Sequence, residues 1–266
     1  MSTTRYPLLV CCVTVVLMAA MARGVLDRRA IPLGAYATSL GGRTASQVAN
    51  AGRAAEAMDG TVLRPGGEFS FVATTGPWTV DRGYRKAPVS YDGELVRSFG
   101  GGVCQTSSTL YCAALAAGLD VLERHRHTWP AGYVPPGGDA AVAPGGIDLR
   151  LRNPYPFAVR LRAGREGDEL ICRVEGRAQP GAQRRPLPTF LVRHETTDIV
   201  PAPEVSRPDS ALPRGSRKVL KRGQPGYHVR TTRLRVEPDG SSVHRLISED
   251  CYPPLSRVVR VGTGPG

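Results

Sequence analysis

A cysteine at the predicted start of a helix is the sharpest chemical feature of this 266-residue chain. Cys104 follows three glycines, residues 100–102, and opens the segment VCQTSSTLYCAALAAGL, whose later turns are apolar on every side. At a helix start, the macrodipole and the free amide groups stabilise a thiolate and lower the pKa of the thiol. The same amides, together with the side chain of Gln105, could stabilise an oxyanion. The pattern therefore suggests a nucleophilic thiol.

Two histidines and two carboxylates follow Cys104 in the chain. His125 and His127 stand two residues apart, so they share a face if their segment is a strand. Asp139 and Asp148 come next. Cysteine, histidine and aspartate in this order, on a helix and then on strands, are how papain-like and transglutaminase-like nucleophile sites are assembled, with the histidine as base and the carboxylate orienting it. This hypothesis expects one of the two imidazoles within about 4 Å of the cysteine sulfur.

The same residues permit two other interpretations. His125 and His127, together with Cys104 or Asp139, could coordinate a zinc ion tetrahedrally. Alternatively, the arginine-flanked histidines lie on a solvated strand, the glycines only form a tight turn, and no chemistry occurs. Chain order fixes no distances, so all three interpretations stay open. We expect no cofactor, and we expect a ligand-binding groove to be lined by Gly100, Gly101, Gly102, Ser107 and Tyr133.

Two predicted helices position these residues. Thr44 and Gln47 form a capping box, in which each side chain bonds to the backbone amide of the other residue. The helix that begins there has one apolar face and should end at Gly60. The second helix carries the cysteine, should be buried all round along residues 110–117, and should stop at Gly118.

Strands should surround the second helix. Residues 148–152 and 158–162 alternate apolar with basic side chains, the period of two that is typical of half-buried strands. Residues 177–188, RAQPGAQRRPLP, lack apolar periodicity and are rich in proline and arginine, as linkers are. Residues 189–264 hold short alternating runs and no credible helix. The predicted fold class is therefore α+β, with a buried helix packed on antiparallel strands over residues 33–176, followed by an extended all-β module.

The first segment, residues 1–22, resembles a targeting signal. Arg5 precedes PLLVCCVTVVLMAAMA, an apolar run of 16 residues. A membrane-spanning helix needs about 20. The run ends in the small-x-small pattern Ala20-Met21-Ala22, which is typical of signal-peptide cleavage. We expect a secretory signal, with an uncleaved membrane anchor as the alternative, and a mature chain that starts near Arg23 outside the cytoplasmic membrane.

Loss of the signal would leave four cysteines. Cys104 and Cys112 lie eight residues apart in one predicted helix. Their backbones would then be about 12 Å apart, too far for a disulfide. Cys172 and Cys251 fall in strand-like segments of different regions and could pair in an exported protein.

Composition narrows the class of protein. The chain has 31 glycines and 23 prolines, which dislike helix interiors and exclude long helical bundles and coiled coils. Its net charge is +12 and its pI is about 9.9, which suits an anionic partner. The basic residues are almost all arginine, and no basic run is interleaved with aromatics, so an anionic envelope surface is favoured over nucleic acid.

The segments TVLRPGGEFSF, GYRKA and GGGVCQTSSTLYCAALAAGLDVLERHRHTWPAGYVPPGGDAAV together resemble the VanW-like family over about residues 33–165. The family is named for a protein of vancomycin-resistance clusters, and the resemblance implies an exported cell-envelope protein. The family pattern often has proline where Arg126 stands and serine near Thr128. These departures leave the cysteine, glutamine, histidine and aspartate candidates in place.

The C-terminal residues 189–264 resemble a G-five (G5) domain, an extended β module of bacterial envelope proteins. The resemblance depends on spaced glycines and on the closing Gly262-Thr263. It implies binding to peptidoglycan or another anionic wall polymer, or a spacer role, with membrane contact only through the N-terminal segment.

Two hypotheses from different classes remain. In the first, a Cys/His enzyme, an amidohydrolase or transpeptidase, acts on a peptide or amide bond of peptidoglycan in a resistance or wall-remodelling context. Cys104 would be its nucleophile, His125 or His127 its base and Asp139 the orienting group. In the second, a non-catalytic envelope protein binds the wall through its glycine-rich loop and its C-terminal module.

Overall fold

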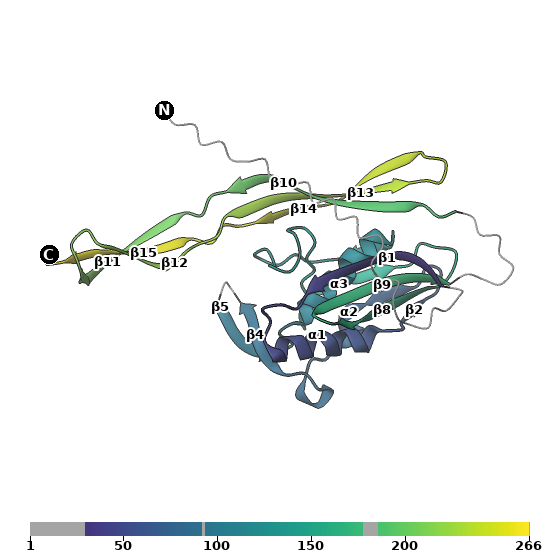
Figure 1. Ribbon diagram of the computed structural model, residues 1–266, viewed down its shortest axis with the longest axis horizontal. Coiled ribbons are helices and arrows are strands. Elements are labelled where there is room, and N and C mark those ends of the chain that lie inside the picture. The colour runs from purple at the N-terminus through teal and green to yellow at the C-terminus, as the bar shows by residue number, and fades with distance from the viewer. Residues whose placement is uncertain (1–29, 92–93, 178–185, 266) are drawn as a thin grey trace.

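Helix α3 (Val103–Ala116), which carries Cys104, lies inside the N-terminal domain of the computed structural model (Figure 1). Every side chain from Gln105 to Leu115 is buried. Gly118 follows the helix with a positive φ of 74° and ends it as predicted. The sequence predicts burial only for the apolar second half of this helix, and the structure extends burial to its polar first half.

The structure describes residues 30–91, 94–177 and 186–265. The predicted signal segment 1–22 lies outside the described residues, as does most of the predicted linker. No helix in the described part of the chain is long and apolar enough to span a membrane.

An antiparallel sheet of four strands packs against α3. Its order is β1-β9-β8-β2, and α3 contacts β1 and β9. The strands are β1 (Ala30–Ser39), β9 (Glu169–Arg177), β8 (Val159–Glu166) and β2 (Val62–Leu63). The alternating segment predicted at residues 158–162 therefore forms a sheet strand, as expected.

A smaller sheet, β3-β7-β6, lies next to α3 and contains the other predicted alternating segment. Strand β3 ends at Ser70, whose hydroxyl accepts the Ala73 amide at 3.1 Å and so caps the short helix α2. The remaining small elements are β3 (Glu68–Ser70), β7 (Arg150–Arg152), β6 (Asp120–Glu123), α2 (Phe71–Thr75), the 3-10 turn η1 (Val80–Arg82) and the hairpin β4 (Lys86–Tyr91) and β5 (Glu94–Phe99).

Helix α1 (Ala45–Met58) begins with the predicted capping box. The Gln47 amide donates to the Thr44 hydroxyl at 3.3 Å, and the Thr44 amide donates to Gln47 Oε1 at 3.1 Å. The helix ends at Asp59, directly before Gly60. One face of α1 closes the core beside α3 and β8.

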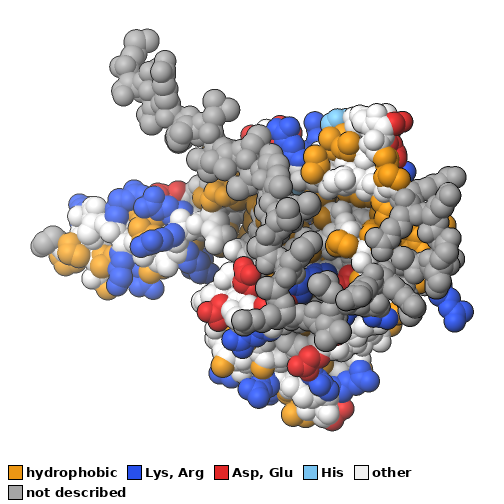
Figure 2. Space-filling view, turned by 45° about the vertical axis from the view of Figure 1, so that its right-hand side comes forward, with side chains coloured by type: hydrophobic (Ala, Val, Ile, Leu, Met, Phe, Trp, Pro, Cys, Tyr) orange, Lys and Arg blue, Asp and Glu red, His pale blue; other side chains and the backbone are white. Residues whose placement is uncertain are grey.

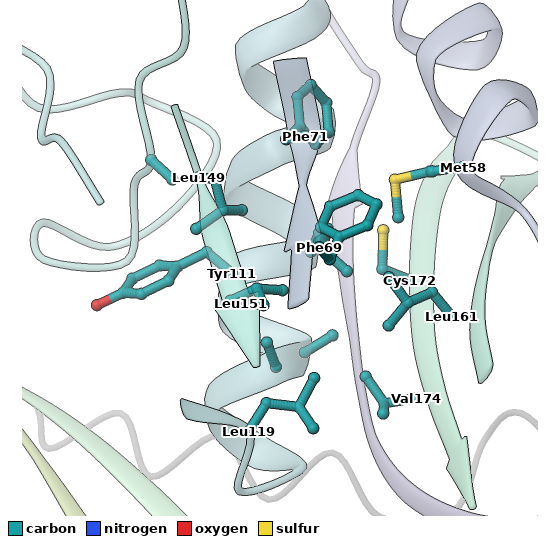
Figure 3. Close-up of a cluster of buried hydrophobic side chains, with 14 of the residues drawn as sticks. Met58, Phe69, Phe71, Tyr111, Leu119, Leu149, Leu151, Leu161, Cys172 and Val174 are labelled. Carbon is teal, nitrogen blue, oxygen red and sulfur yellow. The ribbon is translucent and has the colours of Figure 1, made fainter. Parts of the chain in front are cut away.

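The core lies between α3, α1 and the two sheets (Figure 3). Its large side chains come from helices and strands far apart in sequence and converge on α3, and they include Met58, Phe69, Phe71, Tyr111, Leu119, Leu149, Leu151, Leu161, Cys172 and Val174. Burial of this much apolar surface fixes α3, and with it Cys104, relative to the sheets.

The C-terminal module is all-β, as predicted, and consists of two three-stranded sheets placed end to end (Figure 1). The first sheet, β10-β13-β14, is antiparallel, whereas β11 runs parallel to β15 in the second sheet, β11-β15-β12. The strands are β10 (Thr189–Val200), β11 (Glu204–Pro213), β12 (Arg217–Lys221), β13 (Gly226–Val236), β14 (Ser242–Tyr252) and β15 (Arg257–Gly264).

The first of these sheets packs on the N-terminal domain. Arg233 is only 6% exposed, and its Nη1 donates to the Leu119 carbonyl at 2.8 Å. Phe190 lies against Gly118, where a Cβ would meet the ring at 2.2 Å. The second sheet, β11-β15-β12, projects away from the domain (Figure 1). We call these two parts the docked half and the projecting half of the module.

All four cysteines outside the predicted signal are free in the structure. Cys104 and Cys112 do not pair, as helix geometry predicts. Cys172 is buried in β9 and Cys251 is exposed on β14, so the disulfide considered from the sequence is not formed.

Candidate active site

Cys104 occupies the first turn of α3 and is half-buried. Its thiol donates to the Val142 carbonyl at 3.5 Å. The residues before the helix adopt left-handed conformations at Gly100 and Gly102, with φ of 83° and 106°, and so let the chain turn sharply into the helix. The predicted placement of a thiol at a helix start is therefore present in the structure.

His127 joins this thiol to a buried carboxylate. Its ring Nδ1 lies 2.7 Å from Asp139 Oδ2, and its backbone amide donates to the same oxygen at 2.6 Å. Asp139 is 0% exposed. Because Nδ1 is engaged by the carboxylate, Nε2 is the ring nitrogen left for the thiol, and the imidazole lies close enough to Cys104 to shift the pKa of the thiol. Cysteine, imidazole and carboxylate thus form a continuous chain.

Proton affinities in this chain favour an ionised pair. Burial opposes ionisation of Cys104, but the hydrogen bond and positive charge of His127 outweigh it, so the pKa of the thiol lies below its ordinary value. Burial also opposes protonation of His127, yet the hydrogen bonds to Asp139 and Cys104 raise its pKa well above the usual range. The pKa of Asp139 is lowered despite burial, chiefly by His127 and then by Arg124. The site therefore supports a thiolate beside an imidazolium.

Two further side chains bind Asp139, and a third binds one of these two. Arg124 Nη2 lies 3.1 Å from Asp139 Oδ1, and Arg124 Nε donates to the Asp139 carbonyl at 2.6 Å. The Tyr252 hydroxyl donates to the same Oδ1. Arg124 Nη1 in turn lies 2.6 Å from Asp250 Oδ1. Tyr252 and Asp250 belong to β14 of the C-terminal module, so both domains contribute to the surroundings of Asp139.

Two serines of α3 tie the Asp139 segment to the helix that carries Cys104. Ser107 Oγ donates to the Ala140 carbonyl at 2.6 Å, and Ser108 Oγ accepts the Ala140 amide at 2.9 Å. Ser107 is buried, so the structure gives it this structural role and does not expose it as the ligand-binding residue expected from the sequence.

The structure separates the two histidines. His125 Nε2 lies 2.9 Å from Glu123 Oε1, and its side chain is 44% exposed. The strand β6 ends at Glu123, so the period of two that would give both rings one face does not extend to these residues. Of the two histidines, only His127 interacts with Cys104 and Asp139. In the described part of the chain, no group of three or more His, Cys, Asp or Glu side chains is arranged to hold a metal ion.

Gln105 and the glycines before the helix are engaged by other parts of the protein and do not line a binding surface beside the thiol. The Gln105 side-chain amide donates to Thr38 Oγ1 at 3.0 Å and to the Ser39 carbonyl at 2.8 Å, so it is engaged by β1. A Cβ on Gly101 or Gly102 would meet backbone oxygens of the protein at 2.6 and 2.3 Å. These glycines allow α1 and β4 to approach the helix start closely.

Tyr133 lies near the thiol, as expected for a residue of the site. It is half-buried, packs beside Cys104, and interacts with Ser108. The Arg43 guanidinium lies 4.9 Å from the centre of its ring. Asp148, the second carboxylate after the histidines, instead accepts the Ser70 hydroxyl at 2.5 Å and the Val72 amide at 2.9 Å, at the start of α2. It takes no part in the site.

Three residues of the site are not among those that the sequence predicts, namely Arg124, Asp250 and Tyr252. Arg124 stands next to the histidines, but a basic residue between a glutamate and a histidine carries no signal of its own. Asp250 and Tyr252 lie more than a hundred residues from Asp139, and only the packing of β14 against the N-terminal domain brings them there.

The fold and the site together define a two-domain protein, in which an α+β domain with a thiol, imidazole and carboxylate cluster is followed by an elongated β module. The VanW like protein family model matches residues 46–175, and the G5 domain model matches residues 192–264. The chain is a VanW-like protein with a C-terminal G5 domain. These domains mark it as a cell-envelope-associated protein.

Two curated proteins resemble the VanW-like part of the chain. The uncharacterized protein YoaR of Bacillus subtilis is 38% identical over 156 residues, which cover 59% of this chain and 52% of YoaR. The vancomycin B-type resistance protein VanW of Enterococcus faecalis is 28% identical over 142 residues, 52% of each chain. The chain therefore spans about half the length of these relatives.

Two solved structures match the C-terminal region. The crystal structure of HP0197-G5 has 25% sequence identity and a TM-score of 0.19, and the match covers 27% of this chain and 97% of that one. The structure of the IgA1 protease G5 domain also has 25% identity, with a TM-score of 0.22 and coverage of 29% and 93%.

Proposed function

We propose that this protein is an exported cysteine-nucleophile enzyme that acts on peptide or amide bonds of peptidoglycan. The observation that carries the proposal is the chain of contacts from Cys104 through His127 to the fully buried Asp139. A buried carboxylate that orients a histidine against a low-pKa thiol is the arrangement that acyl transfer by cysteine requires. A purely structural cysteine needs neither partner.

The reaction would begin with attack of the Cys104 thiolate on the carbonyl carbon of the scissile amide. As the carbon–nitrogen bond breaks, the His127 imidazolium gives its proton to the leaving amine, and a thioester remains on the enzyme. Water or a second amine then attacks the thioester, and His127 takes a proton from this attacking group. The carbon–sulfur bond breaks and the Cys104 thiolate is restored. Water gives hydrolysis and an amine gives transpeptidation.

Backbone donors at the start of α3 would stabilise the developing oxyanion. Gln105 is unavailable for this role through its side chain, which bonds to β1. The backbone amides of Val103 and Gln105 donate to the carbonyls of Gly100 and Gly102. The Cys104 amide, in the first helical turn and next to the nucleophile, is the donor we assign to the oxyanion.

Replacement of the nucleophile tests the proposal directly. Purified full-length protein is incubated with peptidoglycan from its host, and new amines and released fragments are measured by mass spectrometry. We expect Cys104→Ser to lower product formation by at least about 1000-fold, because the hydroxyl has no lowered pKa in this site.

The melting temperature of the Cys104→Ser variant should stay within about 2 °C of the wild type, since the two side chains are nearly isosteric. A wild-type protein that is folded yet yields no product from any wall fraction, or a serine variant as active as the wild type, contradicts the proposal.

Export is the second part of the proposal. Residues 1–22 carry the features of a signal, and both matched domains are those of envelope proteins. N-terminal sequencing of the protein from its native host should then begin near Arg23. Recovery of the uncleaved chain in the cytosolic fraction contradicts this part.

A non-catalytic role in wall binding has its own support in the projecting half of the G5 domain. Residues 201–225 and 253–265 carry eight arginines and lysines against two acidic residues. Figure 2 shows these basic side chains gathered over the projecting arm. Such a surface suits an anionic wall polymer. The two roles are compatible, with the arm binding polymer and the N-terminal domain acting on it.

Charge reversal on the arm separates binding from catalysis. Lys218→Glu with Arg222→Glu should weaken binding to an anionic wall polymer at least about tenfold at low salt, and the difference should shrink as salt screens the charges. Both side chains are exposed, so folding should be unaffected. The matched control reverses two exposed arginines of the N-terminal domain, Arg64 and Arg165. Equal losses in both double variants, measured by co-sedimentation, would show that net charge alone matters.

A further inference from the structure

The G5 domain contributes buried polar groups to the immediate surroundings of the candidate active site. Tyr252 is 0% exposed, and its hydroxyl accepts the Gly137 amide at 2.8 Å while donating to Asp139. Asp250 is 8% exposed, and it binds Arg124 on one oxygen and accepts the Ser248 hydroxyl at 2.9 Å on the other. Both residues lie on β14.

The charges alternate along this network. His127 binds Asp139, Asp139 binds Arg124, and Arg124 binds Asp250. The side chains of Arg124, Asp139 and Asp250 are each no more than 7% exposed, so solvent screens these contacts weakly. With the carboxylate of Asp250 in place, Arg124 interacts with two anions. It therefore stabilises the negative charge of Asp139 less than it would without Asp250.

We propose that β14 of the G5 domain is a working part of the catalytic site, in which Asp250 and Tyr252 act as positioning residues that fix Asp139 and Arg124 and so set how tightly His127 holds its proton. The proposal rests on the proposed function of Cys104 and His127. It follows that the docked half of the G5 domain and the wall-modifying site form one unit. Separation of the two domains would then remove the reactivity of Cys104.

The other groups that face this pair keep one charge state between pH 5 and pH 9. Tyr133, Tyr111 and Tyr252 have pKa values raised mainly by burial and stay neutral. Burial, followed by Arg124, lowers the pKa of His194 on β10 to about 4, so that this histidine is neutral as well. Three guanidinium groups lie over aromatic rings near the site, namely Arg43 over Tyr133, Arg124 over Tyr111 and Arg126 over Tyr252.

The test is the pH dependence of Cys104 alkylation by iodoacetamide in the full-length protein, followed by peptide mass spectrometry. Asp250→Asn keeps an oxygen for Arg124 but removes the negative charge. Loss of this anion leaves more positive surroundings, which favour the deprotonated form of both His127 and Cys104. Because the pKa of His127 is high, the imidazolium persists in the range where the thiol ionises. We therefore expect the midpoint of the alkylation profile to fall by about 0.5 to 1 pH unit.

Glu249→Gln is the matched control for this variant. Glu249 is the neighbouring carboxylate on β14 and pairs with Arg230 at 2.9 Å on the exposed side of the strand. Removal of its charge should leave the midpoint within about 0.2 pH units of the wild type. An Asp250→Asn variant that melts like the wild type and keeps the wild-type midpoint overturns the proposal.

Tyr252→Phe provides a second route if Asp250→Asn does not fold. It removes one donor from Asp139 without changing charge, and the midpoint should move upward as the carboxylate loses its fixed orientation. Tyr155→Phe is its control, because the Tyr155 hydroxyl donates to the Ala117 carbonyl at 2.7 Å away from the site. Both variants should lose similar stability, and only Tyr252→Phe should move the midpoint. If both leave it unmoved, β14 has only a structural role.

The two proposals fail differently. A wild-type Cys104 with the alkylation profile of an ordinary cysteine removes the proposed function, and the role of β14 with it. A wild-type profile with a low midpoint that no β14 variant changes leaves the proposed function standing and removes only the role of β14.

Discussion

At pH 6, iodoacetamide should alkylate Cys104 of the wild-type protein about 10 to 100 times faster than Cys104 of a His127→Ala variant. Cys104 is half-buried, and the loss of solvation alone would raise the pKa of its thiol. His127 reverses this effect, and its own pKa is high enough for the imidazolium to persist at this pH. Without the imidazole, burial dominates and little thiolate is present. The rates are measured by timed quenching and peptide mass spectrometry.

Cys112 supplies an internal reference in the same experiment. Burial raises the pKa of its thiol, with Asp139 adding to the effect, so it should stay unmodified in both proteins. Asp148→Asn is the control for loss of a nearby carboxylate that binds the start of α2. It should leave the Cys104 rate unchanged, whereas Asp139→Asn should lower it. Equal rates of Cys104 alkylation with and without His127 would contradict the assignment of Cys104 and His127 as a thiolate–imidazolium pair.

The largest expected loss of stability follows Gly102→Ala. Gly102 has a φ of 106°, and a Cβ there would lie 2.3 Å from the Gln47 carbonyl oxygen of α1. Backbone strain and the steric clash should together lower the free energy of unfolding by about 4 kcal/mol. For a chain of this size, that corresponds to a fall in melting temperature of about 10 °C. Thermal unfolding followed by circular dichroism gives the value.

Gly164→Ala is the matched control on β8. The φ of Gly164 lies outside the left-handed range, and a Cβ there would meet nothing within 4 Å. Its melting temperature should stay within about 2 °C of the wild type. If Gly102→Ala unfolds at the same temperature as this control, the helix start is less constrained than its contacts indicate.

Local signals were enough to predict several elements correctly. The capping box at Thr44 and Gln47 gives the start of α1, since its hydrogen bonds are made within one turn. The alternating segments give β7 and β8, because one face of each is buried. The placement of Cys104 at a helix start follows from the glycines before it and the apolar run after it.

The details of the site depend on contacts that no local pattern encodes. The choice of His127 over His125 depends on where β6 ends and on the pairing of His125 with Ala141. The polar first half of α3 suggests a ligand-facing surface from sequence, whereas the structure buries it against β1 and the Asp139 segment. These groups find protein partners only after the chain has folded.

The docking of one half of the G5 domain also fixes the distance between Cys104 and the basic projecting half. Arg233 and Phe190 hold the first sheet to the N-terminal domain, while the second sheet, β11-β15-β12, follows the first end to end. A polymer held by the basic arm would therefore lie at a set span from Cys104, determined by strands and not by a flexible tether. Such an arrangement raises the effective concentration of bonds at that span along the polymer. Under the proposed function, the Cys104 site would then need only weak intrinsic affinity for each bond, and cuts or crosslinks would recur at a characteristic spacing along the wall.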